Sequence, residues 1–346
     1  SVLESLTQQL KQSTALSVQQ VGAAVSALVD ENVSVPSKAN FLTALARKGE
    51  TTEEIAAFAR ELRDKSIRPP YAGESLDVCG TGGDHLKTFN ISTTVAFIVA
   101  AAGIPVAKHG NRAITSQSGS ADVLEALGIR IDLTPEQAAQ SLREQHFAFF
   151  FAPRYHPAFK HIGPARKLCA ERGQRTIFNF LGPLLNPARP TAQLVGVPQP
   201  RLCEPIARVL QSLGIRRGMV VSGCVGKDCF LDELSTLGDT TIAEFYQDRG
   251  FSTCVFTQPH THGALSDLAG GDSAANAEII RRILRSEDYG PKRDAVLLNA
   301  GAALLVAGRA KSISQGAELA AELVDSGATM KKLEALRKYG TTAGIS

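Results

Sequence analysis

The sequence predicts an α/β protein with a small helical N-terminal domain and a larger α/β domain, in which helices flank a central mixed sheet. Apolar residues before position 70 follow helical spacing, and two adjacent prolines then interrupt the pattern. From residue 76 onward, short apolar runs alternate with glycine-rich loops and helical segments, as in α/β domains. We therefore place the helical domain at 1–70 and the α/β domain at 71–346.

The helical domain is predicted from periodicity and from its end signals. Apolar side chains recur at helical spacing from Val18 to Leu28. Thr51 and Glu54 form a capping box at the start of a further apolar pattern. Pro69 and Pro70 end the helical unit, and a linker follows.

The α/β domain is predicted from alternating strands and helices. Loops are expected at 80–84 and 108–112, and helix and turn at 157–190, which we expect to complete the helical domain. Thr134 followed by Pro135 is a strong helix start. Strands are predicted at 76–79, from 106, at 147–152 and at 219–222; helices are predicted at 92–103 and 119–127, with more at the C-terminus.

Composition and charge exclude several classes of protein. The 346 residues carry a net charge of +3, which does not indicate a broad basic surface for nucleic acid. The longest apolar stretch, 95–107, contains Gly103 and Pro105 and is too short to span a bilayer. No signal peptide is recognised at the N-terminus, so we expect a cytoplasmic protein.

The six cysteines predict reduced thiols and no zinc site. None of them forms a C-x-x-C pair. His260 and His262 follow Cys254, but they lie in a stretch rich in Pro, Thr and Gly that is typical of a loop.

Two segments near the first strand are suited to phosphate. The loop 80–84, Gly-Thr-Gly-Gly-Asp, lets the backbone approach a ligand and point N–H groups at anionic oxygens, although a structural turn would look the same. The run 88–94 gathers four hydroxyls and an amide where a helix begins, and helix N-termini bind phosphate. Simple capping would need only one of these residues.

A third anion-friendly segment covers 108–116 and follows the second strand. Lys108 and Arg112 supply positive charge, and Gly110 permits close approach of a ligand. A surface loop with incidental charge is the alternative, which becomes less convincing with three such segments within 45 residues. A basic run from Arg154 to Arg175, including Arg166, is either a solvated helix face or part of the site.

Asp232 and Glu233 lie between apolar residues and are candidates for a magnesium site. Adjacent carboxylates near a strand end suit Mg²⁺, which keeps several waters and bridges to substrate phosphates. An exposed acidic turn is the general alternative. The suspected polyphosphate site favours the metal.

Six motifs together resemble the anthranilate phosphoribosyltransferases, a family of the nucleoside phosphorylase type. They are GTGGD, NISTT, KHGNRAITSQSGSADVLEALG, FAPRYHPAFKHIGPARK, RTIFNFLGPLLNPA and LDELS, in that order, and the similarity extends from about residue 10 to the C-terminus. The resemblance implies a homodimer that uses Mg²⁺ to transfer the phosphoribosyl group of 5-phosphoribosyl 1-diphosphate to anthranilate in tryptophan biosynthesis.

The resemblance also implies roles for individual residues. Lys108, Asn111 and Arg166 would be catalytic, and Ser92, Asp232 and Glu233 would hold the metal. Anthranilate would contact Gly80, His109, Asn111, His156 and Arg166. The phosphoribosyl diphosphate site would comprise Gly80, Gly83, Asp84, Thr88, Asn90, Ile91, Ser92, Thr93, Lys108, His109, Gly110, Asn111, Arg112, Ala113, Ile114, Thr115, Ser116 and Ser120, with the segment 108–116 closing over it.

The chain departs from the family pattern near the paired acids and in the basic run. Phe230 replaces a usual Gly, 236–239 lacks a usual Pro, and 224–229 is an unusual insertion. Lys160 stands where several relatives have an uncharged residue. These changes put in question the shape of the metal loop and the outer anthranilate channel, while both carboxylates are retained.

The expected reaction displaces diphosphate at the anomeric carbon through an oxocarbenium-like transition state. One rival is a pyrimidine nucleoside phosphorylase, which would not need the paired acids. A second is a family member that has lost catalysis and binds nucleic acid, which should show lost motifs and a broad basic surface. The intact motifs and near-balanced charge speak against both.

Overall fold

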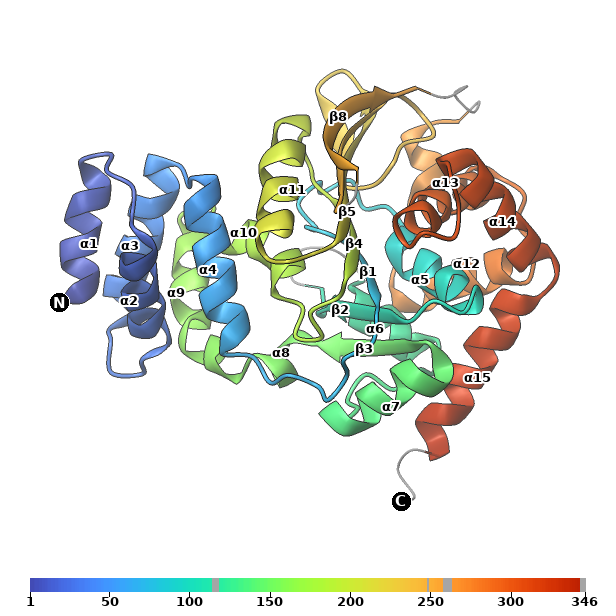
Figure 1. Ribbon diagram of the computed structural model, residues 1–346, viewed down its shortest axis with the longest axis horizontal. Coiled ribbons are helices and arrows are strands. Elements are labelled where there is room, and N and C mark those ends of the chain that lie inside the picture. The colour runs from blue at the N-terminus through green and yellow to red at the C-terminus, as the bar shows by residue number, and fades with distance from the viewer. Residues whose placement is uncertain (114–117, 248, 258–262, 343–346) are drawn as a thin grey trace.

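The computed structural model describes residues 1–113, 118–247, 249–257 and 263–342. Its first part is a bundle of helices at one end of the molecule (Figure 1). The bundle consists of α1 (Val2–Lys11), α2 (Val18–Val29), α3 (Val35–Lys48) and α4 (Thr52–Asp64). The predicted capping box begins α4: Thr51 Oγ1 accepts a hydrogen bond from Glu54 N, and Glu54 Oε2 accepts one from Thr51 N.

A later segment of the chain packs onto this bundle. It contains α8 (Ala152–Tyr155), the 3₁₀ helix η1 (Pro157–His161), α9 (Gly163–Glu171), α10 (Phe178–Leu181) and η2 (Gly182–Leu185). Ile162, Ala165 and Cys169 are fully buried in the same core as the apolar side chains of α1–α4. The buried Lys38 of α3 donates to the carbonyl of His161 at 2.9 Å. The segment is thus fixed to the bundle by apolar packing and by a buried ammonium group.

The second part is built around a mixed sheet whose order is β3-β2-β1-β4-β5-β7-β8, with β6 paired to β5. The strands β3, β2, β1, β4 and β5 run parallel, and β6, β7 and β8 add antiparallel pairs. Their bounds are β1 Leu76–Gly80, β2 Val106–Gly110, β3 Phe147–Phe151, β4 Ala192–Gly196, β5 Arg217–Gly226, β6 Cys229–Leu231, β7 Thr240–Tyr246 and β8 Gly250–Phe256. The predicted mixed sheet flanked by helices is confirmed.

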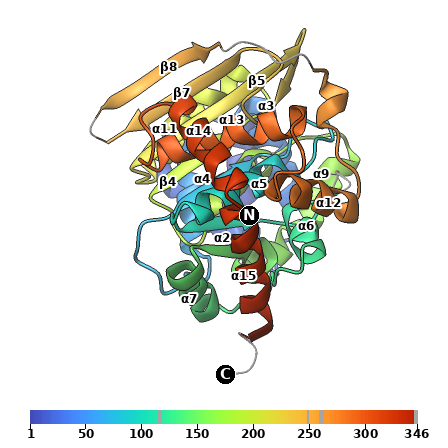
Figure 2. The same cartoon turned by 90° about the vertical axis from the view of Figure 1, so that its right-hand side faces the viewer.

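Helices cover both faces of the sheet and bury two large cores. On one face lie α4 and α11, and on the other lie α5 and α12–α15, which stand in front of the sheet in Figure 2. The remaining elements are α5 Ile91–Ala101, α6 Ser120–Ala126, α7 Pro135–Gln145, η3 Pro200–Leu202, α11 Cys203–Ser212, η4 Leu265–Leu268, α12 Ser273–Leu284, α13 Pro291–Val306, α14 Ile313–Asp325 and α15 Ala328–Thr342.

One sequence expectation about the second strand was wrong. We expected Lys108, His109 and Gly110 in a loop, but they form the last three residues of β2 and pair with β3. The apolar pattern ends at Ala107, so the strand's polar end resembled a loop. Its side chains are held by rigid sheet, which fixes their directions more firmly than a loop would.

Candidate active site

The sequence motifs meet where the parallel strands β1, β2 and β4 end. Parallel strands bring their carboxyl ends to one edge of a sheet, and α/β proteins bind ligands there. The loop after β1, the polar end of β2 and the N-terminus of α5 all lie at this edge. The segment 229–235 joins them from the far side of β4.

Lys108 is a buried cation in this group. Its Nζ donates to the carbonyl of Val78 at 2.7 Å and to Ser92 Oγ at 3.3 Å. Burial lowers the pKa of Lys108, while the nearby acids Asp77 and Glu233 oppose that change. The strand therefore holds the ammonium group next to the hydroxyl that begins α5.

Three carboxylates converge opposite this lysine. Asp232 Oδ2 accepts a hydrogen bond from Gly82 N at 2.7 Å, and Asp84 Oδ2 accepts one from Asp232 N at 3.3 Å. Burial, followed by the charges of Asp84 and Glu233, raises the pKa of Asp232 well above its usual range. Burial also raises the pKa of Glu233 to about 8, although Lys108 lowers it in part. Like charges in a buried site oppose one another, so a cation there would be stabilising.

This donor set fits Mg²⁺ better than a metal held entirely by protein. Within the described residues, no three His, Cys, Asp or Glu side chains form a ready-made metal cage. Mg²⁺ prefers one or two carboxylates together with water and substrate phosphate. The loop is also close-packed: a Cβ at Gly80 would lie 2.5 Å from Asp232 Oδ2. Gly82 adopts a φ of 72°, which favours glycine.

The N-terminus of α5 is open to a ligand. No side chain in the described part of the chain caps this helix, so the first-turn N–H groups have no hydroxyl partner, although Ser92 N approaches the Glu233 carboxylate. The side chain of Asn90 is held by Ser118 O and by Asn276. Thr93 and Ile91 are buried, and Thr88 pairs with Ala269 in an isolated β-bridge.

The segment after β2 is anchored to α6. Asn111 O accepts hydrogen bonds from Ser120 Oγ and from Ala121 N, and Asn111 Oδ1 accepts one from Arg112 N. The guanidinium of Arg112 pairs with Glu125 at 2.8 Å and also with Asp122, at the surface. Arg112 is thus already engaged with acids. Ala113 N donates to Asp122, and three further predicted residues lie outside the described part of the chain: Ile114, Thr115 and Ser116.

A continuous series of rings leads from β2 to α9. The ring centroids of His109 and His156 lie 5.2 Å apart, and His156 stacks on Phe159 at 4.9 Å. Phe159 contacts Phe178 edge-on at 5.8 Å, and the guanidinium of the half-buried Arg166 lies 5.0 Å over the ring of Phe178. The structure therefore brings His109, His156 and Arg166 into one series of contacts, although His109 and Arg166 are 57 positions apart in the sequence.

Both histidines of this series are neutral. Burial, with smaller effects from His156 and Lys108, lowers the pKa of His109 to about 3. Burial lowers the pKa of His156 to about 4, against a weaker opposing effect of the Leu185 carbonyl. Burial also lowers the pKa of Arg166, and no described acid pairs with its guanidinium. A series of contacting rings that ends at a cation with no acidic partner among the described residues suits a planar organic anion.

The unusual segment 224–229 forms a hairpin. It extends β5 to Gly226 and turns at Asp228, whose φ is 54°, into β6. Directly after β6 come the paired acids, and Leu234 is then fixed by the buried Asn299 of α13, which accepts from Leu234 N and donates to Leu234 O. The hairpin and Asn299 therefore hold the acids from both sides.

Several buried polar residues at the site were missed in the sequence. Asp77 lies in β1 between two apolar residues and meets Asn186, Gln193 and the backbone of His109. Asn299 lies in an apolar helix. A polar residue in an otherwise apolar element is the signal that could have identified both.

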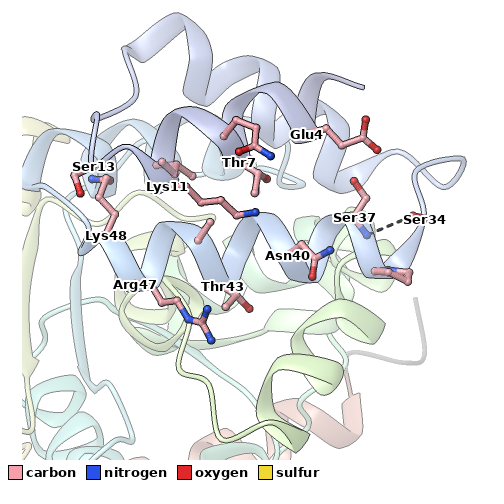
Figure 3. Close-up of a pocket in the computed structure, with 14 residues that line it drawn as sticks. Glu4, Thr7, Lys11, Ser13, Ser34, Ser37, Asn40, Thr43, Arg47 and Lys48 are labelled. Atoms are coloured by element: carbon pink, nitrogen blue, oxygen red, sulfur yellow. Dashed lines mark hydrogen bonds between the residues drawn. The ribbon is translucent and has the colours of Figure 1, made fainter.

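A separate cavity of about 740 Å³ lies in the helical bundle between α1 and α3. Figure 3 shows Lys11, Asn40 and Arg47 among its lining residues. It shares no lining residue with the edge of the sheet described above. We take the sheet edge as the functional site because the buried carboxylates, Lys108 and the open helix terminus lie there.

Other sequence expectations concern metals and membranes. All six cysteines are free thiols. His260 and His262 lie outside the described residues, so the loop predicted there is untested. None of the helices in the described ranges has the length and apolar character needed to cross a membrane.

Comparison with known proteins assigns the chain to a family. Residues 4–66 match the helical bundle domain of a glycosyl transferase family, and residues 72–330 match its a/b domain. A protein from Citrifermentans bemidjiense, named anthranilate phosphoribosyltransferase, is 48% identical over 319 residues, covering 86% of this chain and 87% of the relative. A protein of the same name from Symbiobacterium thermophilum is 44% identical, covering 97% of each chain. The chain belongs to the anthranilate phosphoribosyltransferase family.

Solved structures of the family share the fold over nearly the whole chain. The anthranilate phosphoribosyltransferase of Thermus thermophilus gives a TM-score of 0.87 at 38% identity and covers 97% of this chain and 99% of its own. The Saccharomyces cerevisiae enzyme in complex with PRPP and Mg gives a TM-score of 0.86 at 26% identity and covers 98% of each chain. The yeast enzyme has also been solved with 4-fluoroanthranilate.

Proposed function

We propose that this protein transfers the phosphoribosyl group of 5-phosphoribosyl 1-diphosphate to anthranilate, giving N-(5-phosphoribosyl)anthranilate and diphosphate, in L-tryptophan biosynthesis. The observation that carries the proposal is the convergence of Asp84, Asp232 and Glu233 on Lys108 and the N-terminus of α5. The matching names of relatives at 44–48% identity support it.

The phosphoribosyl diphosphate would lie at the ends of β1 and β2. The first turn of α5 offers the N–H group of Thr93 to phosphate, while Ser92 N already donates to the Glu233 carboxylate, and the loop after β1 offers Gly83 and Asp84. Lys108 supplies positive charge from a buried position. Gly80, Thr88, Asn90, Ile91, His109, Gly110, Asn111, Arg112, Ala113, Ile114, Thr115, Ser116 and Ser120 complete the proposed set, in which Ile91 would contribute its backbone only because its side chain is in the core.

Mg²⁺ is the metal that we propose for this site, as in the yeast complex. Asp232 and Glu233, with Ser92 Oγ, would hold it. When bound, it would neutralise the negative charge that collects on the leaving diphosphate. Asp84 supports the arrangement by accepting a hydrogen bond from Asp232 N.

Anthranilate would lie against the rings of His109 and His156, between β2 and α9. Arg166 is the group we propose for its carboxylate, because a guanidinium can grip a carboxylate through two parallel hydrogen bonds. His109 and His156 would contact its ring, together with Gly80 and Asn111. An N–C bond would form at the anomeric carbon as the C–O bond to diphosphate breaks, and the amine nitrogen would release one proton to water or to the departing diphosphate.

Catalysis would then be mainly positioning and electrostatic stabilisation. An oxocarbenium-like transition state needs the two reactants aligned and the leaving group's charge compensated. Lys108 and the α5 N–H groups provide fixed positive charge on the diphosphate side. The neutral histidines and Arg166 orient the aromatic substrate on the other side.

The decisive test is an assay of the purified protein. Anthranilate is fluorescent, and we expect its fluorescence to fall when phosphoribosyl diphosphate and Mg²⁺ are both present, and not when either is omitted. Cleavage of a pyrimidine nucleoside by inorganic phosphate, without any consumption of anthranilate, would show the rival phosphorylase activity instead.

We further propose that the chain forms a homodimer in the cytoplasm. The family resemblance supports the homodimer, and the six free thiols suit a reducing compartment. Light scattering should give twice the chain mass of 36.7 kDa.

A further inference from the structure

A buried network ties the segment after α10 to the central strands. Gln193 of β4 donates from Nε2 to Pro183 O at 2.6 Å and to Asp77 Oδ2 at 3.4 Å. Asn186 donates from Nδ2 to Asp77 Oδ2 at 2.9 Å and to Ala107 O at 2.7 Å. The side chains of Asp77, Asn186 and Gln193 are almost completely buried. A fully hydrogen-bonded buried network of this kind holds the backbone that it contacts, here the segment 183–186, in one position.

The carbonyl next to this network determines the state of His109. Gly182 O lies 3.2 Å from His109 Nδ1. A carbonyl only accepts hydrogen bonds, so Nδ1 must carry the proton of the neutral ring, and Nε2 is left as a bare acceptor. His109 Nε2 is buried and meets no hydrogen-bond partner among the described residues. The ring of His109 is the first of the contacting rings that lead to Arg166.

We propose that Gln193 and Asn186 are positioning residues for the transfer reaction. They hold the Gly182 carbonyl in place, the carbonyl keeps His109 in its Nδ1–H form, and Nε2 accepts a hydrogen bond from the aromatic amine of the acceptor substrate. The inference rests on the proposed function. It assigns to His109 a defined tautomer and to the buried amides a role in setting it.

A locked tautomer would serve the reaction in a specific way. The attacking amine nitrogen must direct its lone pair to the anomeric carbon, so its N–H bonds need an acceptor elsewhere. A neutral imidazole with a free Nε2 offers that acceptor, whereas the other tautomer would present an N–H that donates to the amine lone pair and so competes with the attack. Fixing the tautomer in advance removes a reorganisation step from the reaction.

The first test measures the tautomer without any turnover. The ¹⁵N chemical shifts of His109 in the ligand-free protein distinguish a protonated from a bare ring nitrogen, and His109→Gln identifies the signal. We expect Nδ1 to be protonated in the wild type, and Gln193→Met to give a mixture of tautomers. The exposed Gln140→Met is the matched control and should leave the signal unchanged. A wild-type ring protonated at Nε2, or an unchanged ring in folded Gln193→Met, would overturn the proposal.

The second test measures turnover and does not depend on the stability of Gln193→Met. In His109→Gln the amide reaches the place of Nε2, whereas in His109→Asn it reaches only the place of Nδ1. We expect His109→Asn to lose about tenfold more of kcat than His109→Gln, with any change in the KM for phosphoribosyl diphosphate the same in both. Equal losses in the two variants would contradict the acceptor role. Absence of wild-type transfer would instead refute the proposed function, while the tautomer measurement would still stand.

Discussion

Replacing Arg166 by Ala tests the proposed anthranilate site. Arg166 lies on α9, is half-buried, and places its guanidinium over the ring of Phe178. Burial without an acidic partner is unfavourable for a cation, as the lowered pKa of Arg166 indicates. An arginine kept in this state is expected to have an anionic ligand as its partner.

The size of the effect follows from the interaction removed. A hydrogen bond to a charged group contributes roughly 1.5–3 kcal/mol. Each 1.4 kcal/mol is about a factor of ten in binding, so Arg166→Ala should raise the KM for anthranilate by about ten- to a hundredfold. The KM for phosphoribosyl diphosphate should change much less, because the proposed site for that substrate is at the other end of the ring series.

Lys167→Ala provides the matched control. Lys167 is the next residue of the same helix, but it is exposed. Initial rates from anthranilate fluorescence, with each substrate varied in turn, give the two KM values for each variant. If Arg166→Ala and Lys167→Ala have equal effects, or if only phosphoribosyl diphosphate is affected, Arg166 belongs to a generally basic surface and the assignment is refuted.

Three further changes test other parts of the site. Replacing Asp232 and Glu233 together by Ala should abolish the Mg²⁺-dependent rate and keep the far-ultraviolet circular dichroism of the wild type; near-normal turnover at low Mg²⁺ would exclude the metal role. Gly83→Val would place side-chain carbons against Pro198 and should weaken phosphoribosyl diphosphate binding far more than anthranilate binding in calorimetry, with equal losses arguing against that role. Burial raises the pKa of Asp77 to about 6 from 3.8. Between pH 3.8 and about pH 6 the folded protein therefore keeps a proton on Asp77 that the unfolded chain has released. The free energy of unfolding should fall as the pH rises through this range. Asp77→Asn removes this pH dependence. Thermal unfolding should show the free energy of unfolding of the variant rising by up to about 3 kcal/mol relative to wild type from pH 4 to pH 7. A difference that stays constant over this range would show that Asp77 does not titrate there.

Local patterns in the sequence predicted most of the secondary structure. The capping box of Thr51 and Glu54 and the Pro135 helix start need only neighbouring residues, and both appear as expected. The end of β2 could not be predicted in the same way. Lys108 enters the strand because its ammonium group reaches the Val78 carbonyl on the adjacent strand, a partner 30 residues away.

The residues around the site required knowledge of the fold. Asn186 meets Asp77 across 109 positions, and Asn299 meets Leu234 across 65. No periodicity connects such pairs, because they are neighbours only after the strands and helices are packed. The family resemblance named the residues that would touch substrate. It did not name the buried amides that hold them.

Because α9 is packed onto the helical bundle, the proposed anthranilate residue and the proposed diphosphate residue belong to different parts of the protein. Arg166 is carried by the bundle through the packing of Ala165 and Cys169, whereas Lys108 is carried by the sheet. A rotation of the bundle against the sheet would move one reactant relative to the other while each kept its own contacts. Substitutions in the core shared by the bundle and the sheet would therefore alter the attack distance, and with it kcat, more than either affinity. The rate of transfer would then depend on the packing between bundle and sheet, at residues that touch neither substrate.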